Sequence, residues 1–441
     1  MGAQCRRDHN STERSAVRIA IPLTGTRGDV QPVVALGLEL QRRGHDVLLG
    51  APPNLVDFVT GTGLAARSCG PDVQQLYSSD AGQQALAAGN TLRLMQLVAR
   101  QMAGYAEQMN REVIDVCAGA DLIVASTVTE DRASSVAEAM GVPLVSLHYF
   151  PCRANGAYPF PGALPPQWRP PAPVNRATWA LAENLRRLVF MRYLNDLRAT
   201  LGLPKSMAST AAVLARRHVP EVQIYDRALV PGLPEQWDAR RPFTGFLTLD
   251  HAARAAVGDL DGDHAGILSW IEEGDPPVFF GFGSMPIRDT AAVLAMATEV
   301  SARLGVRALV SAGWSDLDVA TAQAGPNVKV VGPFAYDVVF PHCAAAVHHG
   351  GIGTLFESLR AGLPTLVCSV SFEQPMWGGQ VERLGVGAHM KFTKLTTARL
   401  EQGVTSILDK ECRTRAREFA ETLSADDAGV RTADIVEATA R

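Results

Sequence analysis

Short apolar runs alternate with longer amphipathic stretches along most of this chain. The first run is followed by helical spacing from about residue 30 to Arg43, which stops at Gly44 before a second apolar run. Strands that alternate with helices in this way predict parallel sheets with helices on both faces, which is an α/β fold. The runs that predict strands lie at residues 17–23, 47–49, 122–125, 222–225, 278–282, 308–310, 328–331, 344–347 and 365–368.

The stretch from Ala344 to Gln374 combines a strand, a tight turn and a helix start. Its apolar run ends at Val347, and helical spacing begins at Thr354. Glycines let the backbone come close to a ligand, and the free N–H groups at a helix start favour phosphate. A second apolar run follows the helix, so the loops after both strands should open at one edge of a parallel sheet, where ligands bind. The turn contains His348, His349, Gly350, Gly351 and Gly353.

Acidic and amide residues follow this turn at positions from which they could contact the rest of a bound nucleotide. Glu357 lies one turn into the helix, where a carboxylate can accept hydrogen bonds from a diol but would repel a phosphate. We therefore expect a nucleotide whose phosphates lie on the glycine turn and whose ribose reaches Glu357. Glu373 and Gln374, in the loop after the second strand, would meet whatever lies beyond the phosphates.

These residues resemble the donor signature of the family 1 glycosyltransferases. His349, Glu357, Glu373 and Gln374 match it residue for residue and at the same spacing. The match is closest to the branch with sterol glucosyltransferases and vancomycin-type glycopeptide glycosyltransferases. The resemblance implies that the histidine contacts the diphosphate, the helix glutamate holds the ribose, and the Glu-Gln pair binds sugar hydroxyls. It also implies the GT-B fold, in which two doubly wound Rossmann-like domains face each other across a cleft.

Three further residues are candidates for the donor site. Ser284 follows a buried strand, and the resemblance implies that its loop touches the diphosphate, with Ser284 as a hydroxyl donor. A nucleotide base needs an apolar or aromatic surface, for which Trp314 and Phe334 are candidates, although Trp314 could equally be a core residue. This chain has Ala335-Tyr336 where the resembled proteins usually have Pro-His, which leaves the choice between uridine and thymidine open.

The loop after the first strand reads Gly25-Thr26-Arg27-Gly28-Asp29. From spacing alone, Asp29 is expected to be the N-cap of the following helix. The loop matches that of the glycopeptide and sterol glycosyltransferases, whose matching aspartate is the proposed general base. One carboxylate can do both jobs if an acceptor hydroxyl comes within hydrogen-bond reach. Thr26 and Arg27 complete the predicted donor-binding set.

Asp131 is a second catalytic candidate. Many members of the larger family carry a histidine in the first loop, oriented by a second acidic residue further along the chain. That partner position falls near Glu130 or Asp131, after the apolar run at residues 122–125. The alternative is that Asp131 caps a helix before Ser134.

Two stretches of the first half suit contact with an apolar molecule. Residues 151–174 contain eight prolines and several aromatic residues, which predict a preshaped rim over an acceptor pocket or, alternatively, a surface linker. Residues 178–201 carry leucines at helical spacing with arginines between them. Such a helix could lie on a membrane surface, but we expect an ordinary helix packed on its own domain.

Composition excludes several classes of protein. The 441 residues have a net charge of −4 and are 47% hydrophobic. No uninterrupted apolar run approaches the roughly 18 residues that a membrane span needs, and the absence of a basic cluster argues against nucleic acid as a partner. Seven scattered cysteines without a C-x-x-C pair favour a reducing cytoplasm. We expect a monomer or a weak dimer.

The pattern also predicts how the chain is divided. We expect a disordered leader (residues 1–15), an N-terminal acceptor-binding domain (16–248), a linker (249–266), a C-terminal nucleotide-sugar-binding domain (267–417) and a C-terminal helical segment that packs back on the first domain (418–441).

The resemblance implies an inverting, metal-independent glycosyltransferase. It would move a hexose from a UDP- or TDP-linked sugar to a hydroxyl of a hydrophobic acceptor (a sterol, lipid or natural product), with no cofactor beyond that donor. A nucleotide-sugar epimerase or hydrolase and a non-catalytic sugar-nucleotide-binding protein are the alternatives. The incomplete glycine pattern of Gly281-x-Gly283 disfavours a dehydrogenase. Asp259, Asp261 and Asp263 lack the spacing of a calcium loop and are expected to lie in a solvated linker.

Overall fold

The computed structural model describes residues 16–79, 91–281, 290–311, 327–370, 373–424 and 427–441. In these residues, twelve strands form two six-stranded sheets, and all pairings between neighbouring strands are parallel. The predicted α/β fold is therefore confirmed. The strands are β1 (Arg18–Pro22), β2 (Asp46–Ala51), β3 (Ala65–Ser68), β4 (Leu122–Ser126), β5 (Leu144–His148), β6 (Glu221–Gln223), β7 (Val278–Gly281), β8 (Ala308–Ser311), β9 (Val328–Val331), β10 (Ala345–His348), β11 (Thr365–Ser369) and β12 (Gly387–Lys391).

Both sheets are doubly wound. Their strand orders are β3-β2-β1-β4-β5-β6 and β12-β11-β10-β7-β8-β9. The direction of winding reverses between β1 and β4 in the first sheet and between β10 and β7 in the second. At such a switch point the loops after the two strands diverge and leave a crevice at the carboxyl edge, where ligands bind. The Asp29 loop follows β1 and the glycine turn follows β10, so each lies at a switch point.

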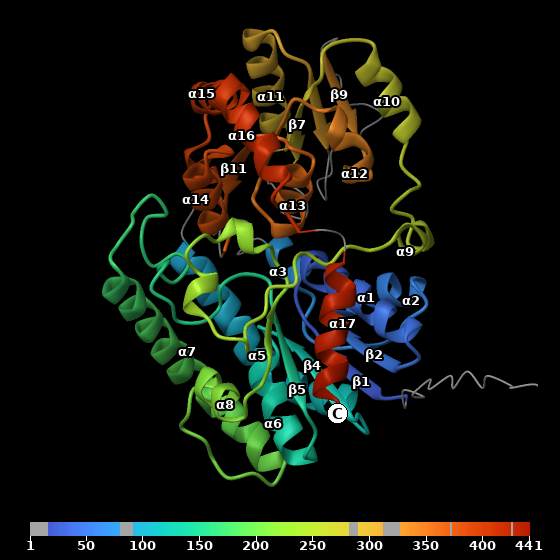
Figure 1. Cartoon of the computed structure of the whole chain (residues 1–441), viewed down its shortest axis with the longest axis vertical. Coiled ribbons are helices and arrows are strands. Elements are labelled where there is room, and N and C mark those ends of the chain that lie inside the picture. The colour runs from blue at the N-terminus through green and yellow to red at the C-terminus, as the bar shows by residue number, and fades with distance from the viewer. Residues whose placement is uncertain (1–15, 80–90, 282–289, 312–326, 371–372, 425–426) are drawn as a thin grey trace, which may run out of the picture.

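Helices cover both faces of the first sheet (Figure 1). Alternate residues of β1 separate the two cores, because Ile19 and Ile21 face α1, α2 and α17, whereas Ala20 faces α5, α6 and α8. The helices described from this half are α1 (Arg27–Arg42), η1 (Pro53–Leu55), α2 (Val56–Gly61), α3 (Val73–Ser78), α5 (Thr91–Cys117), α6 (Glu130–Met140), α7 (Ala172–Thr200), α8 (Thr210–Arg216), η2 (Arg227–Leu229) and η3 (Pro234–Gln236).

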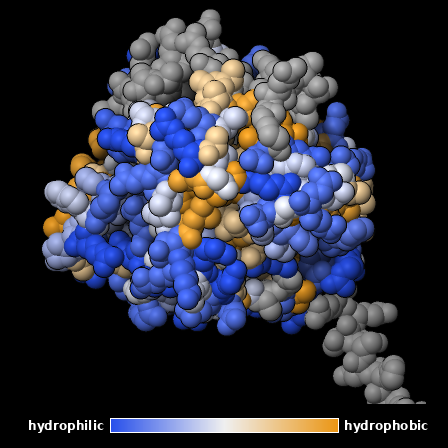
Figure 2. Space-filling view, turned by 90° about the horizontal axis from the view of Figure 1, so that it is seen from above, coloured by the Kyte–Doolittle hydropathy of each residue, from blue (hydrophilic) through white to orange (hydrophobic). Residues whose placement is uncertain are grey.

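The second sheet is covered in the same way. Val278 and Phe280 of β7 pack toward α11 and α15, whereas Phe279 packs toward α10 and α12. Seen from this end of the molecule, hydrophilic residues cover most of the surface around a narrow hydrophobic band (Figure 2). The remaining helices are α9 (His251–Ala256), α10 (His264–Glu272), α11 (Thr290–Leu304), α12 (Tyr336–Val339), η4 (Phe340–His342), α13 (Ile352–Arg360), α14 (Gln374–Leu384), η5 (Phe392–Lys394), α15 (Thr397–Leu408), α16 (Lys410–Ala420) and α17 (Ala428–Thr439).

An apolar cluster joins the two halves of the molecule. The segment after β6 brings Tyr225 against the fully buried Trp377 of α14, with 5.7 Å between ring centroids. Phe246 packs against Phe356 of α13 with 4.8 Å between their ring centroids. The last helix, α17, returns to the first half and packs beside α1 (Figure 1). The carboxyl edges of the two sheets are therefore held in a defined relation to each other.

Residues 249–266 are more structured than a solvated linker. The carboxylate of Asp250 caps α9 by accepting the Ala253 N–H (2.8 Å), and that of Asp263 caps α10 by accepting the Gly266 N–H (2.9 Å). Asp259 forms an ion pair with Arg27 of the first half. The prediction of a solvated linker is therefore wrong for Asp259, because its partner lies at the start of α1, more than two hundred residues away.

Helix α7 only partly fits the expectation of an ordinary helix packed on its own domain. Trp179 and Leu197 are buried, but Leu181, Leu185 and Leu188 are 64%, 54% and 65% exposed. The spacing of the leucines predicts a covered face. The tertiary structure instead places α5 and α6 against the opposite side of the helix, so the expectation is wrong for these three leucines.

Candidate active site

The Asp29 loop is shaped around its carboxylate. Thr26, not Asp29, is the N-cap of α1, and Asp29 lies at the third helical position, so the predicted N-cap assignment is corrected. An Asp29 carboxylate oxygen accepts hydrogen bonds from the Thr26 N–H (2.7 Å) and hydroxyl (3.0 Å). Gly25 has φ +128°, and a side chain there would collide with this carboxylate. Burial raises the pKa of Asp29, while the hydrogen bonds from Thr26 oppose that rise.

Tyr149 anchors the same loop and was not predicted from the sequence. It follows β5, and its hydroxyl donates to the Asp29 carbonyl oxygen at 2.6 Å. Burial raises the pKa of Tyr149 well above its ordinary value, so the phenol stays protonated and keeps donating. A lone tyrosine after a strand carries no local signal of such a role, because the contact joins residues 120 positions apart.

Asp131 lies in the first turn of α6. Its carboxylate accepts the N–H of Arg132 (2.8 Å) and approaches the guanidinium of the same residue (3.6 Å). Among the described residues, no hydrogen bond joins Asp131 to Asp29. These contacts are those of a residue at the start of a helix. They do not connect Asp131 to the candidate base, which it was predicted to orient.

Arg27 is held between the two halves. Besides its ion pair with Asp259, it donates to Gln31 (3.0 Å), and its guanidinium lies 4.5 Å from the centroid of the Phe58 ring. A cavity of about 510 Å³ adjoins it, between the first half and Val257. A donor that binds the Arg27 guanidinium, as predicted, would have to compete with the Asp259 carboxylate for it.

The glycine turn follows β10 and precedes α13 as predicted. Gly350 has φ +89°, and a Cβ there would lie 2.5 Å from Val367. The buried His348 accepts the Gly350 N–H through Nδ1 (3.0 Å), so its ring proton lies on Nε2, which approaches the Ser358 hydroxyl at 3.4 Å. Burial lowers the pKa of His348 to about 3 and keeps the ring neutral, as this arrangement requires. His348 thus positions the turn.

Replacing Gly350 with alanine should deform the turn and abolish the thermal shift that a nucleoside diphosphate produces. The new methyl group would meet Val367, and the residue would have to hold a left-handed conformation costing about 1–2 kcal/mol. Differential scanning fluorimetry with UDP and TDP measures this effect. Gly429→Ala in α17 is the matched control, because its Cβ would meet open space. Equal ligand-induced shifts in both variants would contradict the importance of the turn.

His349 is buried against the same turn with one ring atom unsatisfied. It is 6% exposed, and its Nδ1 atom has no hydrogen-bond partner among the described residues. A Cβ on Gly351 would lie 2.5 Å from its Nε2 atom. Burial lowers the pKa of His349 to about 4. Burying an imidazole nitrogen without a hydrogen-bond partner costs free energy. A polar ligand group that forms a hydrogen bond with this nitrogen would remove that cost.

Glu357 and Thr354 lie beside Tyr336, which occupies the position where the resembled proteins have histidine. Burial raises the pKa of Tyr336, whereas a hydrogen bond with Thr354 and the charge of Arg27 lower it. A hydrogen bond with Asp337 raises the pKa of Arg254, and the charge of Glu357 raises it further. The start of α13 is therefore surrounded by residues from the first half and the interdomain segment.

Phe334 is part of an aromatic cluster beside this site. Its ring packs edge-on against Phe279 (5.7 Å between centroids) and Tyr336 (5.3 Å), and Tyr336 stacks on Phe340 at 4.6 Å. Phe334 remains partly exposed. A base could therefore reach it only at the margin of a packed cluster. Ser284 and Trp314, the other two donor candidates, lie outside the described residues.

Glu373 and Gln374 start α14 across the cleft from Asp29. Burial, and to a lesser extent the charge of Asp29, raises the pKa of Glu373 to about 7. The side-chain oxygen of Gln374 accepts the Val370 N–H at 2.9 Å and shapes the loop after β11. The charge of Asp29 therefore acts on the pKa of a carboxyl group from the other half of the chain.

A buried charge network lies in the first half of the molecule and was not predicted. Arg153 donates to Glu130 at 2.6 Å and pairs with Glu221, which also binds Arg241 at 2.9 Å. His148 lies 3.3 Å from Glu130, and burial lowers its pKa so that it stays neutral. Although burial raises the pKa of Glu130, Arg153 and His148 hold it well below its usual range. The network fixes the start of the proline-rich segment.

The proline-rich segment packs between the halves. Tyr158 is buried, donates to the Pro231 carbonyl (2.6 Å) and lies beneath the guanidinium of Arg383 from α14, 4.8 Å from the ring centroid. Phe160 packs edge-on against Trp179 at 5.2 Å, whereas Trp168 is 60% exposed. Tyr158 is thus not an open rim residue. Its environment depends on a partner from the other half, which the sequence pattern did not indicate.

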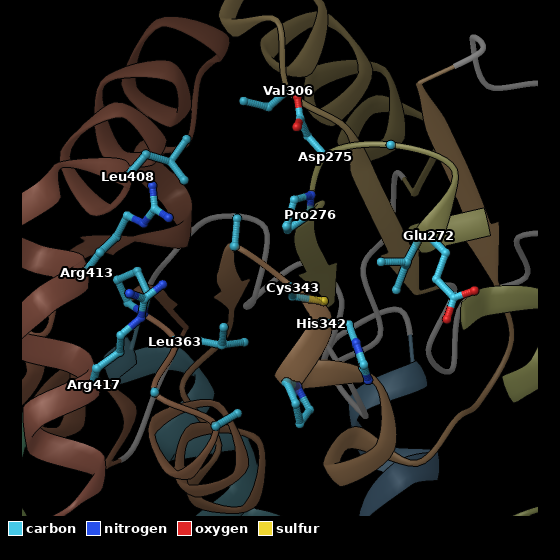
Figure 3. Close-up of a pocket in the computed structure, with 17 residues that line it drawn as sticks. Glu272, Asp275, Pro276, Val306, His342, Cys343, Leu363, Leu408, Arg413 and Arg417 are labelled. Carbon is cyan, nitrogen blue, oxygen red and sulfur yellow. The ribbon is translucent and has the colours of Figure 1, made fainter. Parts of the chain in front are cut away.

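A larger cavity of about 700 Å³ lies at the opposite edge of the second sheet (Figure 3). Its lining includes Pro276, Ala344 and Pro364, which precede β7, β10 and β11, together with Arg413 and Arg417, which point into it. No predicted site residue lines it, so we assign it no part in the chemistry of the cleft. In the described part of the chain, no group of three or more His, Cys, Asp or Glu side chains could hold a metal ion.

Comparisons with known proteins agree with this geometry. Residues 19–159 match the glycosyltransferase family 28 N-terminal domain, and residues 312–438 match the C-terminal domain of erythromycin biosynthesis protein CIII-like proteins. An uncharacterized glycosyltransferase of Mycobacterium tuberculosis is 39% identical over 96% of this chain and 99% of its own length. A sterol 3-beta-glucosyltransferase of Arabidopsis thaliana is 28% identical over 93% of this chain and 66% of its own length.

Solved structures show the same fold at low sequence identity. The calicheamicin glycosyltransferase CalG4 superposes with a TM-score of 0.68 at 17% identity, covering 96% of this chain and 98% of its own. The glycosyltransferase VinC, in complex with dTDP, gives a TM-score of 0.61 at 17% identity, with 96% and 99% covered. Together with the close relatives, these matches confirm that the chain belongs to the family 1 glycosyltransferases of the GT-B fold.

Proposed function

We propose that this glycosyltransferase moves a hexose from a nucleoside-diphosphate sugar to a hydroxyl of a hydrophobic acceptor, with inversion and without a metal ion. The observation that carries the proposal is that the Asp29 loop and the glycine turn, which holds the unsatisfied Nδ1 atom of His349, follow strands at the switch points of the two sheets. The carboxyl group predicted to activate an acceptor and the one predicted to hold the sugar come from opposite halves and interact electrostatically. A sugar held by Glu373 would therefore lie within reach of a base from the other half.

The glycine turn supports a diphosphate on the donor side. The free N–H groups at the start of α13, with Gly351 as its N-cap, carry partial positive charge. His349 offers an unsatisfied buried nitrogen beside them. A diphosphate here would supply the missing hydrogen-bond partner and would receive stabilisation as its negative charge grows. Glu357, one turn further, would hold the ribose.

The reaction follows as a single displacement. The Asp29 carboxylate takes the acceptor hydroxyl proton while the acceptor oxygen forms a bond to the anomeric carbon. The bond between that carbon and the phosphate oxygen breaks, and the nucleoside diphosphate leaves with the electron pair. One attack from the face opposite the leaving group inverts the anomeric centre. The turn N–H groups and His349 stabilise the departing diphosphate.

The relatives support both parts of the substrate assignment. Sterol glucosyltransferases are among them, and dTDP is bound in the VinC structure. We therefore propose a UDP- or TDP-linked hexose as donor and a sterol, lipid or natural product as acceptor. Tyr336 and Phe334 would lie nearest the base and would decide between uridine and thymidine.

Glu357→Ala should weaken nucleotide binding without unfolding the protein. Loss of the hydrogen bonds that two ribose hydroxyls would donate to this carboxylate should cost roughly 1.5–3 kcal/mol, or about 10- to 150-fold in Kd. Titration calorimetry with UDP and TDP measures the change. Glu401→Ala is the matched control, because this half-buried α15 carboxylate forms an ion pair only with Arg303 among the described residues. An unchanged Kd in Glu357→Ala would remove the ribose assignment.

Transfer itself is tested by incubating the protein with UDP-glucose or TDP-sugars and a panel of hydrophobic alcohols, with and without EDTA. Mass spectrometry detects the glycoside, and proton NMR of its anomeric signal gives the configuration. We expect an inverted product that persists in EDTA. Donor conversion without any acceptor would identify an epimerase or hydrolase, and a thermal shift without product would identify a binding protein. Retained configuration would overturn the single displacement.

A further inference from the structure

Helix α7 exposes an apolar face with no neighbour in the described structure. Seven of the ten large apolar side chains exposed in the described residues lie on α7 or beside it. They are Trp168, Val174, Leu181, Leu185, Leu188, Val189 and Met207, and we call them the α7 patch. Met207 belongs to it because its carbonyl oxygen accepts a hydrogen bond from Arg187 of the helix (3.0 Å). Figure 1 shows α7 at the outer edge of the N-terminal half.

The part of the patch that lies on α7 is continuous because of its helical spacing. Leu181, Leu185 and Leu188 recur at i, i+4 and i+7, which places them in a row on one side of the helix. Val174 lies two turns earlier on the same row. Exposing a row of apolar residues costs free energy in water, so a helix keeps one where something covers it.

The charges beside the patch favour an anionic partner. Arg192 is exposed on the leucine row, four residues after Leu188, and Arg176 is exposed near the other end at the flank of the row; one exposed carboxylate, Asp196, lies one turn after Arg192. Among the described residues, none of Arg176, Arg187 and Arg192 forms an ion pair. A row of leucines with unpaired arginines beside it is the pattern of a helix lying in the plane of an anionic membrane surface. None of the described helices is long and apolar enough to cross a bilayer.

A second copy of the chain fits less well. A symmetric contact would set the same patch against itself. The unpaired arginines of the two helices would then approach one another and repel, whereas anionic lipid headgroups would neutralise them.

The patch also adjoins the acceptor side of the cleft. The proline-rich segment runs directly into α7, and Trp179 of the helix donates to the Tyr158 carbonyl at 2.8 Å. The same segment reaches α14 of the other half, where the space beside Gly379 is closed by Pro166. A lipid surface under α7 would therefore lie beside the segment predicted to receive a hydrophobic acceptor.

We propose that the α7 patch docks on a bilayer containing anionic lipids, with the leucines in the acyl boundary and the arginines at the headgroups. Docking needs no turnover, so it can be tested apart from the transferase reaction. The test is flotation of the full chain with phosphatidylcholine vesicles that contain phosphatidylglycerol, compared with vesicles of phosphatidylcholine alone. We expect flotation with the anionic vesicles that weakens as salt rises.

Two sets of variants make the test specific. The triple variant Leu181→Ser, Leu185→Ser, Leu188→Ser should lose at least about tenfold in partition coefficient while keeping its melting temperature, because all three side chains are exposed. Its matched control is Val128→Ser, Val338→Ser, Val430→Ser, which removes exposed apolar side chains elsewhere and should float like the wild type. Arg176→Gln with Arg192→Gln should reduce binding to anionic vesicles by roughly tenfold or more.

Three results would overturn the proposal. One is a wild-type protein that floats with neither kind of vesicle. Another is an equal loss in the leucine and valine triple variants. The third is a dimer of the wild type, seen by light scattering, that the three leucine substitutions dissociate, since that would assign the patch to a second copy of the chain.

Discussion

Asp29→Asn should lower the rate of sugar transfer by roughly a thousandfold, within the range of about 10²–10⁴ that a positioned general base contributes. The side-chain oxygen of asparagine can still accept the hydrogen bonds from Thr26, so the start of α1 should keep its shape. What the variant loses is the ability to take a proton. The rate is measured under saturating donor and acceptor, and nucleotide binding is measured by thermal shift.

This variant separates the two roles that one carboxylate can have. Preserved nucleotide binding with lost turnover assigns the base, whereas lost binding and a lower melting temperature would reduce Asp29 to a helix-start residue. The pH dependence adds a second criterion. Because burial raises the pKa of Asp29 and a base acts only when deprotonated, wild-type turnover should fall as pH drops through a value above 3.8. Unchanged transfer in Asp29→Asn would end the assignment.

Arg153→Met should destabilise the fold by about 3–5 kcal/mol, because it leaves two buried carboxylates without their shared partner. Glu130 is fully buried and Glu221 is 1% exposed, so water cannot replace the guanidinium. Thermal and urea unfolding measure the loss. The difference in unfolding free energy between the wild type and Arg153→Met should diminish at acid pH. Glu130 has a depressed pKa in the fold, so its contribution is present above its ordinary pKa of 4.5 and is lost as pH falls below that value.

Two comparisons test the cause of this loss. Arg240→Met removes the cation of a solvent-exposed pair with Asp238 and should cost at most about 1 kcal/mol. Combining Arg153→Met with Glu130→Gln removes one uncompensated charge and should recover part of the stability. Similar losses in Arg153→Met and Arg240→Met would mean that the buried network is hydrated or relaxed, contrary to its geometry.

Much of the cleft could be predicted from local patterns. The turn at His349 and Gly350 combines a strand end, glycines and a helix start, and each of these depends on residues within a few positions. Parallel pairing then requires the loops after β10 and β11 to share an edge. The Gly25 loop was predicted in the same way, although the capping details changed because Thr26, three residues earlier, took the N-cap position from Asp29.

Contacts between distant segments could not be predicted this way. Nothing near Asp259 indicates that it pairs with Arg27, and nothing near Tyr149 indicates that it anchors the Asp29 loop. The network around Arg153 joins three separate segments that meet only after the first sheet has formed. Each of these side chains is ordinary in its own stretch of sequence, and its partner is chosen by packing.

By itself, the sequence determined the alternation of strands and helices, the two site loops and the family to which their residues belong, because these depend on short-range periodicity and on residue types at fixed spacing. Only the tertiary structure decided that the charge of Asp29 reaches Glu373, that Arg153 is buried between two carboxylates, and that the leucines of α7 remain uncovered. Periodicity shows that a helix has an apolar face. Which faces become covered depends on how much surface the other elements supply, and α5 and α6 cover only one side of α7.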